Sequence, residues 1–167
     1  LVGLLIPELN NPVFPAIAQH LAALLNGRRF TTVLCTATED GVTEDEHIEM
    51  LFDRGMSGLI VVSGKNADTT ADHGMYRRLD EHGMPMVFVN GAVIDIDAPV
   101  VSCDDAHAAS AAVRHLAEMG HRRIGCIVGP RRYVPVQRRL AGYATAVADL
   151  GLEEFVAESF YTVEGGA

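Results

Sequence analysis

Short runs of apolar residues alternate along this chain with longer segments in which apolar residues recur every three or four positions. Residues 1–6 (LVGLLI) form a continuous apolar run, which is typical of a strand buried on both faces of a parallel sheet. In the next segment, Phe14, Ile17 and Leu21 share one face of a helix. This alternation continues along the chain, so we predict an α/β fold built on a doubly wound parallel sheet.

The helices between the predicted strands carry recognisable start signals. Thr43 with Glu46 can form a capping box before the second helix. Asp104 or Asp105 can cap a later helix, and Pro135 suits the first turn of the last one. Strands are expected at residues 1–6, 30–35, 59–62, 84–89, 100–103, 124–128 and 155–160, with a more exposed helix in the latter half of 66–83.

The pattern divides the chain into two lobes. We place the N-terminal lobe at residues 1–121 and the start of a C-terminal lobe at residues 122–167. The second part would hold only two strands and one full helix, which is too little to bury a core of its own well. We therefore expect the second lobe to be incomplete in this chain.

Composition limits the partners that the chain can have. The formal net charge is −9, and an acidic surface repels phosphates, so this segment is not expected to bind DNA by itself. No apolar run reaches the roughly 20 residues of a membrane helix, and Leu1 opens the chain without the basic lead of a signal peptide. Cys35, Cys103 and Cys126 lie in or beside apolar strands without a CxxC pair, which predicts buried, reduced thiols in a cytoplasmic protein.

The loops that follow the strands lack the motifs of common α/β enzymes. No strand is followed by GxGxxG, and GxxxxGK[ST] does not occur, which argues against dinucleotide and P-loop sites. Ser63 lies in no GxSxG turn, so nucleophilic catalysis has no support. The acidic residues around His47 are interpreted as a solvated helix face rather than a metal site. We therefore predict a binding protein that is not an enzyme, with no catalytic residue, metal or cofactor.

Several short segments occur in an order and spacing that together carry a family resemblance. Residues 2–7 (VGLLIP) are followed by residues 11–14 (NPVF), and much later come residues 116–125 (LAEMGHRRIG), Gly129-Pro130 and residues 138–143 (RRLAGY). Together they resemble the effector-binding domain of the LacI/GalR family of transcription regulators, across the whole chain. The resemblance implies a periplasmic-binding-protein-like fold of type I, in which two doubly wound α/β lobes are joined around a ligand cleft.

The resemblance also implies partners for the protein. It implies a small-molecule effector, here a sugar, a sugar phosphate or a nucleoside-like metabolite, that gates a regulator of the repressor type. Operator DNA would be bound through an N-terminal helix-turn-helix that is absent from this chain, and members of the family are usually homodimers. Exported sugar-binding receptors of transport systems share the fold and are the alternative, which the residues upstream of Leu1 would decide.

From the first lobe, the resemblance points to ligand contacts on two loops. Phe14 can stack on a sugar ring or a base, or it can simply begin the apolar stripe of its helix. Asn11 carries an amide that suits hydroxyl groups, although a turn also explains it, and Val13 replaces an aromatic residue of some relatives. Asn90 stands where the family often has Asp, and it can still hydrogen-bond a hydroxyl group.

From the second lobe, Arg139 matches the family's ligand-contacting arginine, whose fork of donors suits vicinal hydroxyls or a carboxylate. Tyr133 and Pro135 fall where some relatives place polar ligand contacts, and Pro135 cannot supply a side-chain hydrogen bond. No acidic residue occurs between Glu118 and Asp149, which leaves two interpretations open: a patch for an anionic ligand, or ordinary surface arginines. The arginines of this stretch are Arg122, Arg123, Arg131, Arg132, Arg138 and Arg139.

Overall fold

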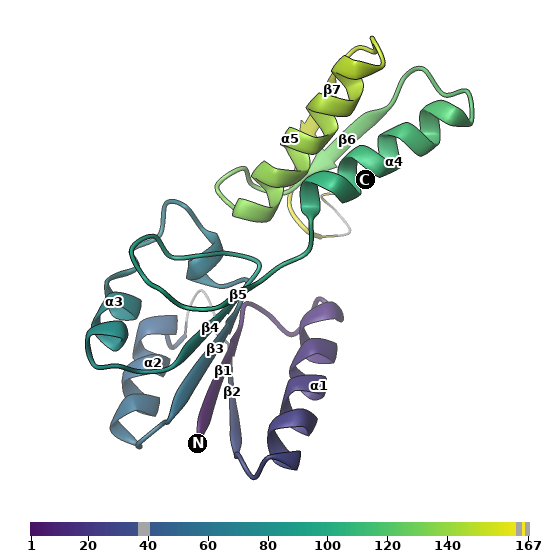
Figure 1. The fold of residues 1–167 in the computed structure, drawn as a ribbon. Helices are drawn as coiled ribbons and strands as arrows, with labels where there is room; N and C mark the ends of the chain where they lie inside the picture. The colour runs from purple at the N-terminus through teal and green to yellow at the C-terminus, as the bar shows by residue number, and fades with distance from the viewer. Residues whose placement is uncertain (37–40, 163–164, 166–167) are drawn as a thin grey trace. The chain divides into compact units, whose positions relative to one another are not determined.

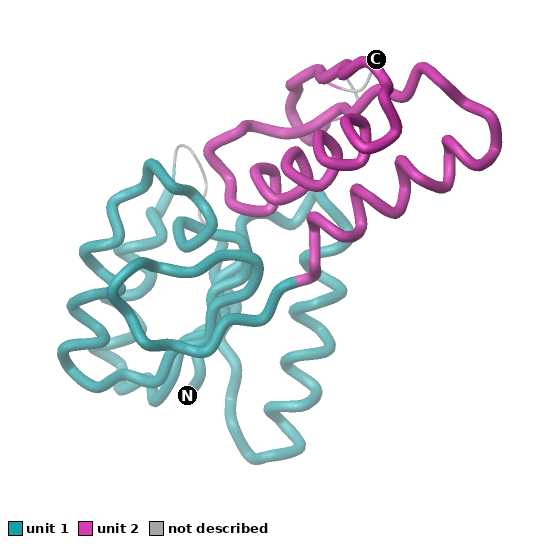
Figure 2. The backbone as a smooth tube through the Cα atoms, turned by 45° about the horizontal axis from the view of Figure 1, so that its top comes forward, with its two compact units in different colours: residues 1–102 teal, residues 103–167 magenta. Residues whose placement is uncertain are grey.

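The computed structural model describes residues 1–36, 41–162 and 165, which form two compact units at residues 1–102 and 103–167 (Figure 2). All of the strands and helices predicted above are confirmed, with ends that differ by a few residues. In chain order the elements are β1 (Val2–Ile6), α1 (Val13–Gly27), β2 (Thr32–Thr36), α2 (Glu44–Asp53), β3 (Gly58–Val62), the 3-10 turn η1 (Lys65–Ala67), α3 (Gly74–Glu81), β4 (Met86–Val89), β5 (Val100–Val101), α4 (Asp105–Glu118), β6 (Gly125–Val128), α5 (Val134–Asp149) and β7 (Phe155–Glu158).

The first unit is a parallel sheet with helices on both faces. Its strand order is β2-β1-β3-β4-β5, and α1 covers one face while α2 and α3 cover the other (Figure 1). The chain leaves β1 in one direction to form β2 and then returns past β1 to form β3. In sheets of this kind, ligands bind beyond the carboxyl ends of the strands, beside the point where the order reverses.

Two apolar clusters fill the space between the sheet and its helices. On the side of α2 and α3, Ile48 and Leu51 pack with Tyr76, whose ring meets Phe88 edge-on at 5.3 Å between centroids. On the other side, Ala18 of α1 packs against the sheet in a smaller cluster, together with the strand residues Leu4, Ile6 and Val62. Burial of each large apolar side chain contributes about 1.5–3 kcal/mol, so these clusters hold the loops at the strand ends on a rigid base.

The predicted helix starts are present. Thr43 Oγ1 accepts the Glu46 N–H at 3.3 Å, and the Glu46 carboxylate accepts the Thr43 N–H at 2.8 Å, which confirms the capping box. Of the two candidates for the cap of α4, Asp104 is the residue that accepts a helix N–H, from His107 at 2.9 Å. Asp105, in the first turn, is therefore available for another contact.

The second unit consists of the parallel pair β6–β7 and the packed helices α4 and α5. Gly142 lies at the closest approach of the helices, where an added Cβ would stand 2.0 Å from the carbonyl oxygen of Ala106. The buried Tyr143 hydroxyl lies 2.8 Å from the carbonyl of Ile124 and accepts the N–H of Phe155 at 2.9 Å. One side chain of α5 thus forms hydrogen bonds with a backbone group beside β6 and with another in β7.

The boundary between the units differs from the one expected after residue 121. The structure divides after Ser102 because α4 packs on α5, through a cluster that includes Val113, Ala117 and Val147. The prediction of three buried thiols is wrong for Cys103, which is exposed because it lies in the extended segment between β5 and α4. Cys35 is buried and Cys126 is partly buried, and all three thiols are free.

No helix within the described part of the chain combines the length and the apolar character that a membrane span requires.

Candidate functional site

The loop after β1 and the start of α1 hold the first three predicted contacts. Asn11 lies two residues before α1: its Oδ1 accepts the N–H of Val13 at 3.2 Å, and its carbonyl accepts the N–H of Phe14 at 3.2 Å. The side chain of Phe14 is partly buried against the cluster around Ala18, which supports its role in the apolar stripe of the helix. Val13 is 56% exposed. The local fold explains Asn11 and Phe14 without a ligand, so their contact with one stays a prediction.

The ends of β3 and β4 carry two residues in an unusual backbone conformation. Ser63 has a φ of 52° and Asn90 a φ of 68°, in the left-handed region that side chains other than glycine rarely adopt. The two side chains meet, because Asn90 Nδ2 donates to Ser63 Oγ at 2.8 Å. Each such conformation costs about 1–3 kcal/mol and persists where the surroundings hold it, which is common at functional sites. Sequence reasoning selected Asn90 and missed Ser63, although each directly follows a buried strand.

A buried carboxylate supports the turn that follows Ser63. Glu44, in the first turn of α2, accepts the backbone N–H of Lys65 at 3.2 Å and the hydroxyl of Tyr76. Lys65 Nζ in turn donates to Asp45 at 2.7 Å. Burial raises the pKa of Glu44 above its ordinary value of 4.5, against the lowering effect of its hydrogen bonds with Tyr76 and Lys65. Helix α2 is thereby tied to the η1 turn through a group whose ionisation is unfavourable.

We expect Glu44 to make the protein less stable as the pH rises. Its folded-state pKa is raised, so the folded protein binds the proton more tightly than the unfolded chain, and stability falls from pH 4.5 upward through the folded pKa. In Glu44→Gln this loss is absent; the amide oxygen can accept the Lys65 N–H, and the amide nitrogen can donate to the oxygen of the Tyr76 hydroxyl. The difference in Tm, variant minus wild type, should therefore increase between pH 4.5 and pH 8 in thermal unfolding.

Glu46 offers a matched control on the same helix. Its hydrogen bonds with the Thr43 backbone and side chain lower its pKa, so its contribution to stability is present above pH 4.5 and is lost on acidification. Glu46→Gln should show a Tm difference that becomes more negative as the pH rises from 3 to 5, opposite in sign to that of Glu44→Gln. Parallel slopes for both variants would contradict the assignment.

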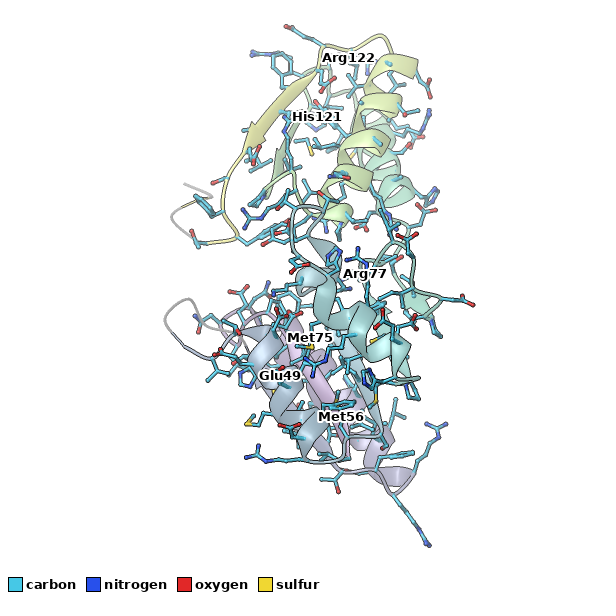
Figure 3. All side chains as sticks on the ribbon, turned by 90° about the vertical axis from the view of Figure 1, so that its left-hand side faces the viewer. Glu49, Met56, Met75, Arg77, His121 and Arg122 are labelled. Atoms are coloured by element: carbon cyan, nitrogen blue, oxygen red, sulfur yellow. The ribbon has the colours of Figure 1, made fainter. Side chains whose placement is uncertain are left out.

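The acidic residues of α2 make structural contacts. Asp45 pairs with Lys65, Glu46 caps the helix, and Glu49 pairs with Arg78 of α3 at 2.9 Å. Figure 3 shows Glu49 of α2 and Met75 of α3 on the side of the first unit that these two helices cover. In residues 1–36, 41–162 and 165, no group of three or more His, Cys, Asp or Glu side chains is placed to hold a metal ion.

In the second unit, Arg139 of α5 is held by a carboxylate that sequence reasoning did not assign to it. Its Nε donates to Asp105 Oδ1 at 2.9 Å, and the Asp105 side chain is 10% exposed while that of Arg139 is 41% exposed. Burial lowers the pKa of Arg139, but the hydrogen bond and charge of Asp105 and the neighbouring Tyr161 outweigh it, so the net direction is upward. The guanidinium is a fixed, permanently charged group with one side open to solvent.

Tyr133 and the other arginines of the second unit are engaged locally. Tyr133 precedes α5, and its carbonyl accepts the N–H groups of Val136 and Gln137 at 3.0 and 3.1 Å. Arg131 pairs with Glu158 at 3.3 Å, and Arg122 donates to the carbonyls of the turn that ends α4. Figure 3 shows His121 and Arg122 at this turn. Arg123 and Arg132 lie over the rings of Phe155 and Tyr133, respectively. These contacts favour ordinary surface arginines over one patch for an anion.

Comparison with known proteins extends these observations. Residues 1–164 match the family described as periplasmic binding proteins and sugar binding domain of LacI family. The chain is 51% identical to the HTH-type transcriptional regulator MalR of Streptomyces coelicolor (strain ATCC BAA-471 / A3(2) / M145), over 99% of this chain and 50% of that protein. It spans about half the length of the curated relatives that it matches.

Solved structures share the fold over the same length. The transcriptional regulator CelR–cellobiose complex aligns with 99% of this chain and 52% of that one, at a TM-score of 0.81 and 27% identity. The transcription regulator CcpA of Lactococcus lactis aligns with 99% of this chain and 60% of its own, at a TM-score of 0.83 and 23% identity, which shows the fold alone. With the family match over residues 1–164, the chain belongs to the family of periplasmic binding proteins and sugar-binding domains of LacI-type regulators.

Proposed function

We propose that this chain is the effector-sensing part of a LacI-type transcription regulator, and that its effector is a neutral saccharide. The relatives support the class of protein, because three that are 49–51% identical to this chain are named transcriptional regulators, and one solved relative is a complex with cellobiose. In this proposal the protein acts in the cytoplasm and catalyses no reaction. Binding energy is used to favour one conformation, with a typical coupling of about 1–3 kcal/mol between effector and DNA.

The observation that carries the proposal is the Arg139–Asp105 pair at the amino ends of α5 and α4. A guanidinium has five N–H donors, and the bond to Asp105 uses the one on Nε. Arg139 is thus oriented by a nearly buried partner while 41% of its side chain is exposed. A donor fork held in this way suits two neighbouring hydroxyl groups of a sugar.

An exported receptor for sugars is the second candidate, since it would use the same fold. The similarity of 49–51% to regulators over 99% of this chain favours the regulator. Operator DNA would be bound by a segment outside this chain, because a net charge of −9 disfavours contact with phosphates. A homodimer would present two such segments to two half-sites.

Thermal unfolding of the full-length protein with cellobiose, ribose, glucose 6-phosphate and adenosine tests the proposal. A neutral saccharide at about 100 times its Kd should stabilise the protein by about 2.7 kcal/mol and raise Tm by several degrees. The same saccharide should change the retention of DNA from upstream of the protein's own gene in a mobility-shift assay. Stabilisation by the phosphate or adenosine alone would contradict a neutral saccharide, and an export leader upstream of residue 1 would contradict the regulator.

A further inference from the structure

A nearly buried carboxylate lies where α2, the η1 turn and the start of α3 meet. Glu44 is 8% exposed, its carboxylate accepts the backbone N–H of Lys65 at 3.2 Å, and the hydroxyl of Tyr76 is its second partner. A Cβ on Gly64 would overlap this carboxylate, so the chain that enters η1 passes directly against it. The turn after β3 is therefore packed on Glu44 itself.

One lysine serves two neighbouring carboxylates of α2. The backbone N–H of Lys65 donates to Glu44, while its Nζ donates to Asp45 at 2.7 Å. Burial also raises the pKa of Tyr76, so its hydroxyl keeps its proton and Glu44 is the group that titrates. The titratable and charged groups that surround Glu44 on these elements are Asp45 and His47 of α2, Lys65 of η1, and His73 and Tyr76 at the start of α3.

The η1 turn belongs to the edge of the sheet at which ligands bind in folds of this kind. It follows the carboxyl end of β3, and a Cβ on Gly91, after β4, would stand 2.5 Å from the Cα of Ala67. The buried Asn66 amide donates to the carbonyl oxygens of Val89 and Gly91 at 3.2 Å each. A turn that moves away from Glu44 must therefore also break contacts with the end of β4.

The charge on Glu44 determines how well the turn fits. In its neutral form, the carboxyl group can accept the Lys65 N–H with one oxygen and donate from the other to the Tyr76 oxygen. In its ionised form it carries a buried charge next to that of Asp45, which already holds the Lys65 ammonium. Moving the turn away gives the carboxylate access to water, so ionisation favours a loosened turn.

We propose that Glu44 is the sensor of a pH-sensitive switch: its proton keeps η1 docked on α2 and α3, and its ionisation loosens the turn and weakens effector binding. The inference rests on the proposed function, because it concerns the binding of the same effector. Burial raises the pKa of Glu44 in the docked protein, so the docked turn loses stability as the pH rises above 4.5. A ligand that prefers the docked turn must then take up protons as it binds.

Calorimetric titration of the full-length protein, in buffers of low and high ionisation enthalpy, counts these protons. Cellobiose is the first probe and ribose the second. Between pH 5 and pH 8, the wild type should take up a measurable fraction of one proton, and its Kd should rise about threefold to tenfold. Glu44→Gln resembles the neutral form and should lose both effects, whereas Glu46→Gln, the exposed control on the same helix, should keep them. Proton uptake that persists in Glu44→Gln would overturn the proposal.

Two further variants identify the titrating group. His73→Gln removes the imidazole whose Nε2 lies 2.8 Å from the Lys65 carbonyl oxygen, and proton uptake should remain. Loss of uptake in this variant alone would assign the sensor to the histidine and overturn the proposal. Tyr76→Phe removes a hydrogen bond that lowers the pKa of Glu44, so the midpoint of the pH dependence should move upward. An unmoved midpoint would contradict the assignment even if Glu44→Gln does not fold.

Hydrogen exchange without ligand keeps this inference separate from the proposed function. The N–H groups of Ala67 and Asp68 bond within the turn, to the carbonyls of Gly64 and Lys65 at 3.0 Å each. Their exchange rate in the wild type, divided by that in Glu44→Gln at the same pH, should rise about threefold or more between pH 5 and pH 8. The same ratio for amides of α5 should stay constant. If no saccharide binds, the proposed function fails while this ratio still reports on the switch, and a constant ratio for the turn would overturn the inference.

Discussion

Replacing Arg139 with alanine should abolish the rise in Tm that a neutral saccharide produces in the wild-type protein. The variant loses the charged donor fork that Asp105 orients, and charge-assisted hydrogen bonds contribute about 1.5–3 kcal/mol each. We expect the Kd to increase by about 100-fold or more, which corresponds to about 2.7 kcal/mol. Thermal unfolding over a range of saccharide concentrations, followed by calorimetric titration, measures both effects.

The Arg139 variant should remain folded, because it removes no buried apolar group. The carboxylate of Asp105 loses its partner, so we expect the free energy of unfolding to fall by about 1–3 kcal/mol. Arg114→Ala is the control: it breaks the exposed 2.6 Å pair with Asp149 between the same two helices, and should cost less than about 1 kcal/mol without affecting binding. A full saccharide response in the Arg139 variant would exclude this residue from the binding site.

A single methyl group at Gly142 should destabilise the second unit severely. An alanine Cβ there would stand 2.0 Å from the carbonyl oxygen of Ala106 and 2.7 Å from its Cα. Both atoms belong to the backbone of α4, so no side-chain rotation can relieve the clash and the helices must separate. Overpacking of this kind costs about 1–3 kcal/mol and occasionally more, and we expect Gly142→Ala to reach about 3 kcal/mol.

Denaturation in urea measures this loss as a lower midpoint for the Gly142 variant. Gly27→Ala serves as the control, because Gly27 ends α1 and an added Cβ would have no neighbour within 4 Å. Alanine has the higher helix propensity, so this variant should be as stable as the wild type or up to about 1 kcal/mol more stable. Equal midpoints for the two variants would contradict the close approach of α4 and α5.

The sequence carried enough local information to predict the elements but not all of their partners. Apolar periodicity located each strand and helix, and Thr43 with Glu46 marked the start of α2, because these signals depend on neighbours within a few residues. The division into compact units after Ser102 depends on the packing of α4 on α5, which no local sequence pattern records. The family resemblance explains why the fold class and the family were predicted correctly.

The sequence allowed candidate residues of the site to be selected, but not the contacts that those residues make. Asn90 and Arg139 could be selected because they follow a strand and match a family segment. Their partners Ser63 and Asp105 lie 27 and 34 residues away in sequence, so only the folded chain brings the pairs together. The left-handed backbone of Ser63 and Asn90 is likewise set by tertiary contacts, since neither residue type requires it.

The hydroxyl of Tyr143 connects α5 to the backbone beside β6 and in β7 through hydrogen bonds. A two-stranded sheet is only marginally stable in water, and this one meets the oxygen of a buried tyrosine at the start of both strands, with the carbonyl of Phe155 at 3.1 Å as well. One hydroxyl oxygen therefore couples the alignment of the strands to the docking of the helix, beside the backbone pairing and the apolar cluster. We therefore expect that a fragment in which β6 and β7 stay aligned must include α5, and that a change that loosens α5 also weakens the pairing of the strands.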